Sequence, residues 1–154
     1  MPNSAKPRHK RGGFLRSRRP KVARPLPHEV DLVFRPLDLI FAQLRAGEID
    51  AYRGAPVFRS FEGELCEVCP ALEGWIETWA LLDSKFRLGI DVAALITLRK
   101  KLVFGVPLTP EEVESAAEVV NRQRLAYARD MDVYEVKSVS RTAEIKLELE
   151  AMNG

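Results

Sequence analysis

The chain contains 154 residues, of which 46% are hydrophobic and 30% are charged. This length and composition are typical of one globular domain with its own apolar core, and they exclude a chain that is disordered throughout. No apolar run approaches the roughly 18 residues that a membrane-spanning helix needs, and the N-terminus lacks the apolar stretch of a secretory signal. We therefore expect a cytoplasmic protein that makes no membrane contact.

The net charge of +2 conceals an asymmetry between the N-terminal segment and the rest of the chain. Residues 1–25 contain nine basic residues and no acidic one, whereas the remainder contains 15 basic and 22 acidic residues. The N-terminal segment therefore carries a charge of +9 and the rest of the chain −7. Such a division is typical of a basic tail on an acidic domain.

The first 29 residues are predicted to form a disordered basic arm, followed by a helical domain over residues 30–154. Prolines recur through the arm and interrupt any helix, its like charges repel, and its few apolar side chains do not offset the entropy lost on folding. Lysine and arginine neutralise phosphates and release counterions, so the arm is predicted to bind nucleic acid. The residues predicted to do so are Lys6, Arg8, Lys10, Arg11, Arg16, Arg18, Arg19, Lys21 and Arg24.

The charge pattern leaves both RNA and DNA open as ligands of the arm. It also leaves two alternatives, a solvated tail that aids solubility and an arm that folds back on its own acidic body. The density of arginine and the absence of acidic residues favour nucleic acid.

The remaining sequence favours an all-α fold, either a small bundle or an orthogonal array of four main helices. The first helix is predicted over residues 36–46, because proline suits its first position and Gly47 suits the residue after its end. Its buried face consists of Leu37, Ile40, Phe41 and Leu44, at helical spacing. Residues 28–35 extend this helix only if Pro36 lies inside it with a kink, and residues 47–60 form a looser segment.

A second helix is predicted within residues 61–87. Its apolar stripe consists of Leu65, Val68, Cys69, Leu72, Trp75, Ile76, Trp79, Leu82 and Phe86. Pro70 lacks the N–H that an interior helical position donates, so the helix either starts near Pro70 or bends there. Trp75 and Trp79 lie one turn apart on this stripe, and we expect them to anchor the core rather than to stack on bases.

Start signals define the next two helices. Asp91 is predicted to cap a third helix. Thr109 followed by Glu112 forms a capping box for a fourth helix. The apolar stripe of the fourth helix continues to Tyr134, and poor helix formers between residues 137 and 142 predict a break.

The C-terminal segment gives two conflicting signals. Ile145, Leu147 and Leu149 alternate with charged residues, which is a strand pattern. The individual propensities of the same residues favour a helix, and a helix is our prediction.

Cys66 and Cys69 form a C-x-x-C pair, and the chain has no second pair. Zinc needs four ligands, and the only histidines, His9 and His28, lie in or beside the arm. We therefore predict two free thiols packed on the apolar face of the second helix, with no metal. Neither histidine has the neighbours of a catalytic triad, and no glycine-rich phosphate loop is present. We expect a protein that is not an enzyme and has no cofactor.

The order of these features resembles that of small uncharacterised helical proteins of bacterial phages and prophages. The similarity lies in the basic cluster over residues 6–11, the Arg19-Pro20 step and the helical body that follows. Arg59-Ser60 before a helix and Leu108-Thr109 at the start of the last long helix add to it. The resemblance implies a bacterial or phage cytoplasmic setting.

These observations predict a non-enzymatic accessory protein that associates with nucleic acid or a ribonucleoprotein through its arm. Phosphate repels the acidic helical body, so we expect the body to contact a protein partner. The alternative is a phage-type interaction module that binds and regulates a host enzyme or complex.

Overall fold

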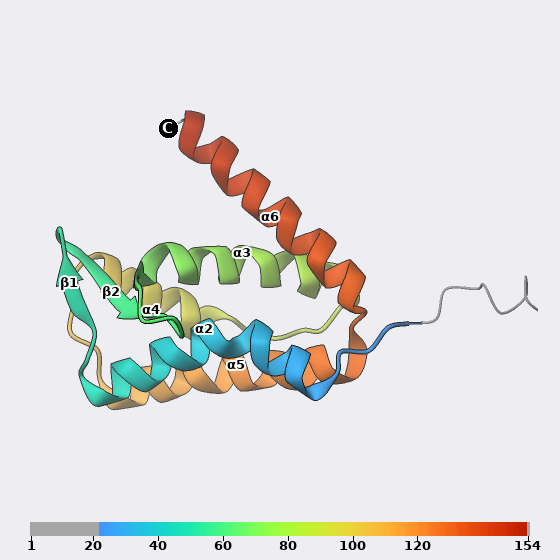
Figure 1. Cartoon of the computed structure of the whole chain (residues 1–154), viewed down its shortest axis with the longest axis horizontal. Coiled ribbons are helices and arrows are strands. Elements are labelled where there is room, and N and C mark those ends of the chain that lie inside the picture. Colours follow the sequence, from blue (N-terminus) through green and yellow to red (C-terminus); the bar gives the residue numbers. More distant parts are fainter. Residues whose placement is uncertain (1–21, 154) are drawn as a thin grey trace, which may run out of the picture.

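The computed structural model describes residues 22–153, which form five helices and one small sheet (Figure 1). Helices α2, α3, α4 and α5 form the body, the sheet covers one end of it, and α6 crosses α3 and rises away (Figure 1). The elements are α2 (Pro27–Ala46), β1 (Asp50–Tyr52), β2 (Ala55–Arg59), β3 (Leu65–Glu67), α3 (Val68–Phe86), α4 (Ala93–Val103), α5 (Pro110–Asp130) and α6 (Val133–Asn153). The fold is mostly helical, as predicted, but the prediction of an all-α fold was wrong because of the sheet.

Helix α2 is longer than the helix predicted from Pro36, and it contains that proline in its interior. Its first turn includes residues 27–29, which the sequence assigned to the arm. The Glu29 carboxylate accepts a hydrogen bond of 3.0 Å from the N–H of Leu26, just before the helix. Gly47 ends the helix at φ 68°, a left-handed conformation that suits glycine.

The sheet is an antiparallel meander in the order β1-β2-β3. Arg53 and Gly54 join β1 to β2, and both have positive φ, as a two-residue hairpin turn requires. Val57 and Phe58 of β2 are both buried, and Phe58 belongs to the hydrophobic core that the helices share. Strands of three to five residues are too short to show a clear alternation of apolar and polar residues, so the sequence analysis missed them.

Helix α3 begins at Val68, which places Pro70 in the first turn, where its missing N–H leaves no bond unmade. This confirms the alternative in which the helix starts near Pro70. Helix α4 begins one residue later than predicted, although the Asp91 carboxylate still accepts a bond of 2.9 Å from the N–H of Ala93.

The predicted capping box of α5 is present. Thr109 Oγ1 accepts from the N–H of Glu112 at 3.2 Å, and the Glu112 carboxylate accepts from the N–H of Thr109 at 3.0 Å. The predicted break at residues 137–142 was wrong, because α5 ends at Asp130 and α6 is continuous from Val133. Packing of α6 on α3 overrides the low helix propensity of those residues.

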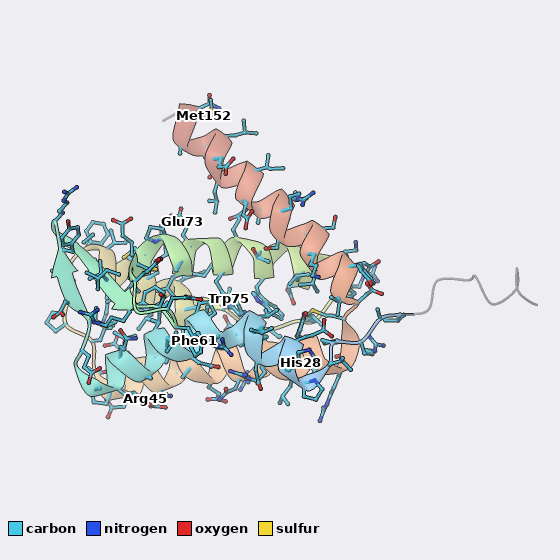
Figure 2. The ribbon with its side chains drawn as sticks, in the orientation of Figure 1. His28, Arg45, Phe61, Glu73, Trp75 and Met152 are labelled. Atoms are coloured by element: carbon cyan, nitrogen blue, oxygen red, sulfur yellow. The ribbon has the colours of Figure 1, made fainter. Side chains whose placement is uncertain are left out.

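Aromatic rings from three helices form the centre of the core. Phe34 of α2 lies edge-on to Trp75 of α3 with ring centroids 4.9 Å apart, and 6.0 Å from the ring of Tyr127 of α5. Trp75 lies between α3 and α2, as Figure 2 shows. Within residues 22–153, no helix has both the length and the apolarity needed to cross a membrane.

Candidate functional site

The residues predicted to bind nucleic acid fall almost entirely outside the part of the chain that the structure describes. Arg24 is the exception, and it lies exposed three residues before α2. The other eight are Lys6, Arg8, Lys10, Arg11, Arg16, Arg18, Arg19 and Lys21. Their role stays a prediction, but the structure defines the point from which their segment departs.

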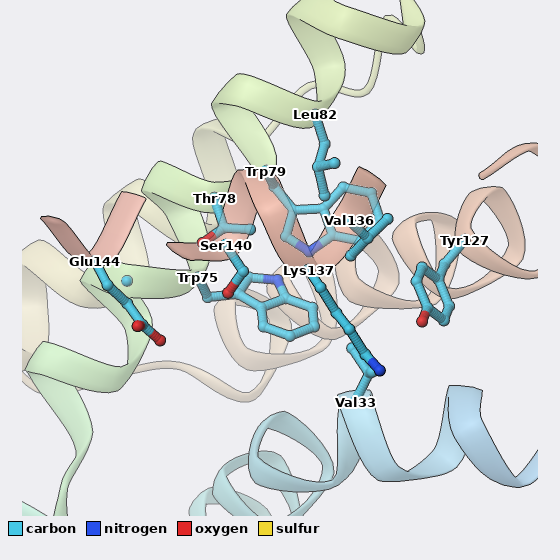
Figure 3. A pocket seen from close by; sticks show the side chains of 11 residues that line it. Val33, Trp75, Thr78, Trp79, Leu82, Tyr127, Val136, Lys137, Ser140 and Glu144 are labelled. Atoms are coloured by element: carbon cyan, nitrogen blue, oxygen red, sulfur yellow. The ribbon is translucent and has the colours of Figure 1, made fainter. Parts of the chain in front are cut away.

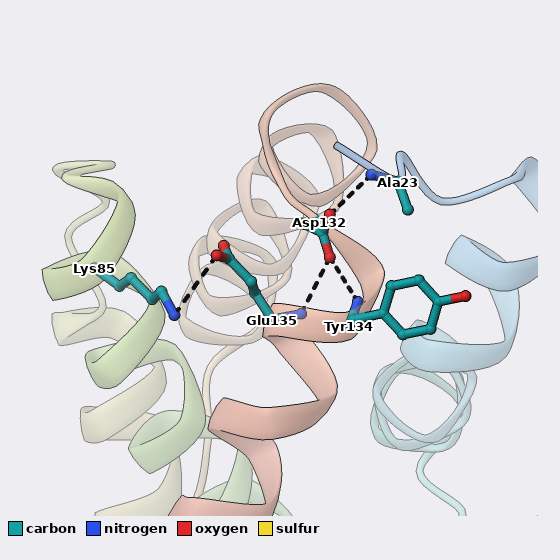
Figure 4. Close-up of polar contacts among 5 residues, drawn as sticks. All are labelled: Ala23, Lys85, Asp132, Tyr134 and Glu135. Carbon is teal, nitrogen blue, oxygen red and sulfur yellow. Dashed lines mark hydrogen bonds and ion pairs between the residues drawn. The ribbon is translucent and has the colours of Figure 1, made fainter. Parts of the chain in front are cut away.

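That point is a bridge between the start of the described chain and the start of α6. The N–H of Ala23 donates to Asp132 Oδ2 at 2.8 Å (Figure 4). The carbonyl of Ala23 accepts from the N–H of Val133 at 2.9 Å. Asp132 Oδ1 accepts from the N–H of Tyr134 at 2.9 Å and that of Glu135 at 3.2 Å, which caps α6. One carboxylate therefore both starts a helix and holds the root of the basic segment.

The electrostatics of this bridge favour the ionised carboxylate. The N–H of Ala23 lowers the pKa of Asp132 most, and the N–H groups of Glu135 and Tyr134 and the charge of Arg24 lower it further. An anion that accepts three hydrogen bonds is more stable than its protonated form, so the bridge is strongest above this pKa.

Nearly half of the basic side chains of the body form ion pairs with its own carboxylates. Seven of the 15 Lys and Arg after residue 25 form ion pairs within the described chain. These seven are Arg45, Lys85, Arg99, Lys101, Arg122, Arg124 and Lys146. Arg45, for example, binds Glu114 at 2.6 and 3.0 Å, and this bond lowers the pKa of that carboxyl. The other eight basic residues share the body with 22 acidic ones, so the body as a whole is acidic.

The two cysteines lie on either side of the boundary between β3 and α3. Cys66 lies in β3 and Cys69 in the first turn of α3, so the prediction that both lie on one helical face was wrong. Both thiols are free and half-buried, and burial raises the pKa of the Cys69 thiol. Among residues 22–153, no group of three or more His, Cys, Asp or Glu converges as metal ligands do.

A groove of about 290 Å³ lies where α6 meets α3 and α2 (Figure 3). Its walls include Trp75 and Trp79 of α3, Tyr127 of α5 and Val33 of α2. Trp79 is buried, as predicted for a core anchor, whereas Trp75 is half-buried and adjoins the groove. Trp75 and Trp79 therefore pack in the core and also line the groove.

Helix α6 supplies the polar rim of this groove. Lys137 extends from α6 toward Val33, and Ser140 and Glu144 follow it along the same helix (Figure 3). An apolar floor with one cation and one anion at its edge suits an aromatic or amphipathic group. The sequence analysis missed these rim residues because it predicted a break there, although Val136 and Ala143 lie seven residues apart on one helical face.

Gln123 is the polar residue buried behind the groove. Its Oε1 accepts a hydrogen bond of 2.8 Å from the indole N–H of Trp75. Its Nε2 has no hydrogen-bond partner within the described chain. The amide therefore fixes the orientation of Trp75 while leaving one of its own groups unsatisfied.

No protein-family model, curated protein or solved structure matches the chain. The function therefore has to be inferred from the residues of this chain.

Proposed function

We propose that this chain is a non-enzymatic accessory protein that associates with nucleic acid, or with a ribonucleoprotein, through its basic N-terminal arm. The observation that carries the proposal is the separation of charge along the chain. Nine basic residues precede residue 26 without a single acid, whereas nearly half of the basic residues that follow are paired with carboxylates. The remaining basic residues of the body lie among 22 acidic ones, so we assign the phosphate contacts to the arm.

The attachment of the arm supports this division of roles. Ala23 is bound to Asp132 and Val133, so the basic residues depart from one fixed end of the molecule. Phosphate held by the arm is kept at that end, and the acidic surface of the helices remains available to a protein partner.

The test is the salt dependence of binding to short duplex DNA and to single-stranded RNA. If all nine basic residues contact phosphate, the logarithm of the binding constant falls with the logarithm of salt concentration with a slope of about −8 on duplex DNA and about −6 on single strands. The test variant carries glutamine at the eight basic positions within residues 1–21 and keeps Arg24 and the Ala23 bridge intact. The slope of this variant is expected to be about −1, and most of its affinity is expected to be lost.

A matched control neutralises exposed basic residues of the body. Arg53→Gln with Lys100→Gln alters two exposed basic residues, one in the β1–β2 turn and one in the last turn of α4, and binding is expected to be unchanged. The proposal fails if the arm variant binds both probes as tightly as the wild type. A protein partner that remains bound after nuclease treatment of a bacterial extract, in wild type and arm variant alike, would favour the interaction-module alternative.

A further inference from the structure

Helix α6 is apolar on two opposite faces. One face is buried against α3 and the aromatic core through Val136 and Ala143. The opposite face carries Ile145, Leu149 and Met152, whose exposed fractions are 50%, 54% and 81%. Spacings of four and three residues keep these three side chains on one side of a helix. Helix α3 covers the first face, and within residues 22–153 the second face stays exposed.

The second face looks away from the body. Helix α6 crosses α3 and then rises from it, and Met152 lies at its outer end (Figures 1 and 2). The ion pair between Lys146 and Glu77 is the last that ties α6 to α3 within residues 22–153. Beyond it, about two more turns of α6 carry Leu149 and Met152 into solvent.

The charged side chains beside this face indicate which kind of helix can pack on it. Arg141 and Glu148 lie beside this face, seven residues apart on the same side of the helix, whereas Lys137 and Glu144 lie further round, at the rim of the groove. None of the four forms an ion pair inside the part of the chain that the structure describes. This side of α6 is therefore positive toward the start of the helix and negative toward its end. A second α6 running in the opposite direction presents the complementary order, whereas a parallel copy places like charges together.

We propose that α6 pairs in antiparallel orientation with α6 of a second copy of this chain. Centring the two-fold axis on Ile145 makes the contact self-complementary, as a symmetric dimer requires. In this register Arg141 lies beside Glu148 of the second copy, and the large side chain of Met152 meets the small Ser138. Arg141 and Glu148 then set the register that the apolar stripe alone leaves undetermined.

The experiment is sedimentation of the full chain over a dilution series, with protein freed of nucleic acid by nuclease and high salt. The expected mass at high concentration is about twice the 17.4 kDa of one chain, and it falls on dilution. Arg141→Glu alone and Glu148→Arg alone each make both symmetry-related contacts repulsive, and each is expected to weaken association roughly tenfold. The double variant exchanges the charges and is expected to restore it.

Leu149→Lys tests the apolar stripe, and Leu125→Lys is its matched control, because both leucines are 54% exposed and Leu125 lies on α5. The first change is expected to abolish association and the second to leave it intact, with unchanged helical circular dichroism in both. A chain that stays monomeric at every concentration would refute the pairing, as would a charge-exchanged double variant no better than the single ones. Loss of association in the arm variant with eight glutamines would assign the contact to the arm instead.

Discussion

The buried amide of Gln123 has a bonded oxygen and, within residues 22–153, an unbonded nitrogen, so its removal should change the free energy of unfolding very little. Gln123→Leu deletes a buried Nε2 that has no partner, together with the Oε1 that accepts from the indole of Trp75. Leaving a buried amide nitrogen unpaired costs about 1–3 kcal/mol, and a net hydrogen bond contributes about 1 kcal/mol. Loss of that bond also leaves the part-buried indole N–H of Trp75 without its acceptor, whereas removal of the unpaired Nε2 is favourable. These effects oppose each other, so the free energy of unfolding should stay within about 1 kcal/mol of the wild type.

Trp75→Phe should behave differently, because it leaves both polar groups of Gln123 buried without partners. The unpaired oxygen and the smaller ring together are expected to lower the free energy of unfolding by about 2–4 kcal/mol. In the double variant no amide remains to be left unpaired. Its loss should therefore be about 1–2 kcal/mol smaller than the sum of the two single losses.

The assay is urea unfolding followed by far-ultraviolet circular dichroism, which does not depend on tryptophan emission. The control cycle combines Gln123→Leu with Trp79→Phe, because Trp79 neighbours Trp75 at a ring distance of 5.9 Å and has no hydrogen bond to Gln123 in the described chain. That cycle should be additive. Additivity to within about 0.5 kcal/mol in the Trp75 cycle would contradict this role of Gln123, as would a loss above about 2 kcal/mol for Gln123→Leu alone.

Three further changes test the contacts between elements. Arg124→Ala should lower the free energy of unfolding, measured in urea, by about 1 kcal/mol, because the guanidinium lies 4.9 Å from the centre of the Phe34 ring. Arg124→Lys should recover less than half of that loss, since an ammonium does not stack flat on a ring. Thr109→Ala should lower it by about 1 kcal/mol through loss of the helix cap, and Thr109→Ser should recover most of that. The pKa of Asp132 is lowered in the folded chain, chiefly by the N–H of Ala23, so its contribution is complete above the ordinary value of about 3.9 and is lost as the pH falls through the lowered one. The difference in unfolding free energy between wild type and Asp132→Ala should therefore shrink between about pH 6 and about pH 2, and a constant difference would contradict this assignment.

Local signals predicted the elements whose ends are encoded in neighbouring residues. Thr109 and Glu112 satisfy each other's backbone N–H groups, so their spacing alone locates the start of α5. Pro70 likewise restricts where α3 begins, because only the first turn tolerates its missing N–H. Such signals depend on a few adjacent residues and need no tertiary contact.

The sheet and α6 depend on contacts that are distant in sequence. Residues 50–67 form short strands that are stabilised by pairing with one another and by the packing of Phe58 in the core shared with the helices. In α6, the alternation of Ile145, Leu147 and Leu149 resembles a strand because successive apolar residues lie on opposite faces of a helix. The position of α6 also determines the groove, so the groove could not be predicted without it. The arm residues were chosen from charge alone, and their role remains a prediction.

The bridge between Ala23 and α6 also determines how the molecule bears mechanical load. A ligand that pulls on residues 1–21 applies force first to the two hydrogen bonds that Ala23 makes with Asp132 and Val133. The start of α6 therefore receives the tension before the first turn of α2 does, four residues further along the chain. Because α2 contributes Phe34 to the centre of the core, this arrangement shields the core from a pull that would otherwise unwind α2 from its end. Under tension, the hydrogen bonds of Ala23 should therefore break while the helical body stays folded.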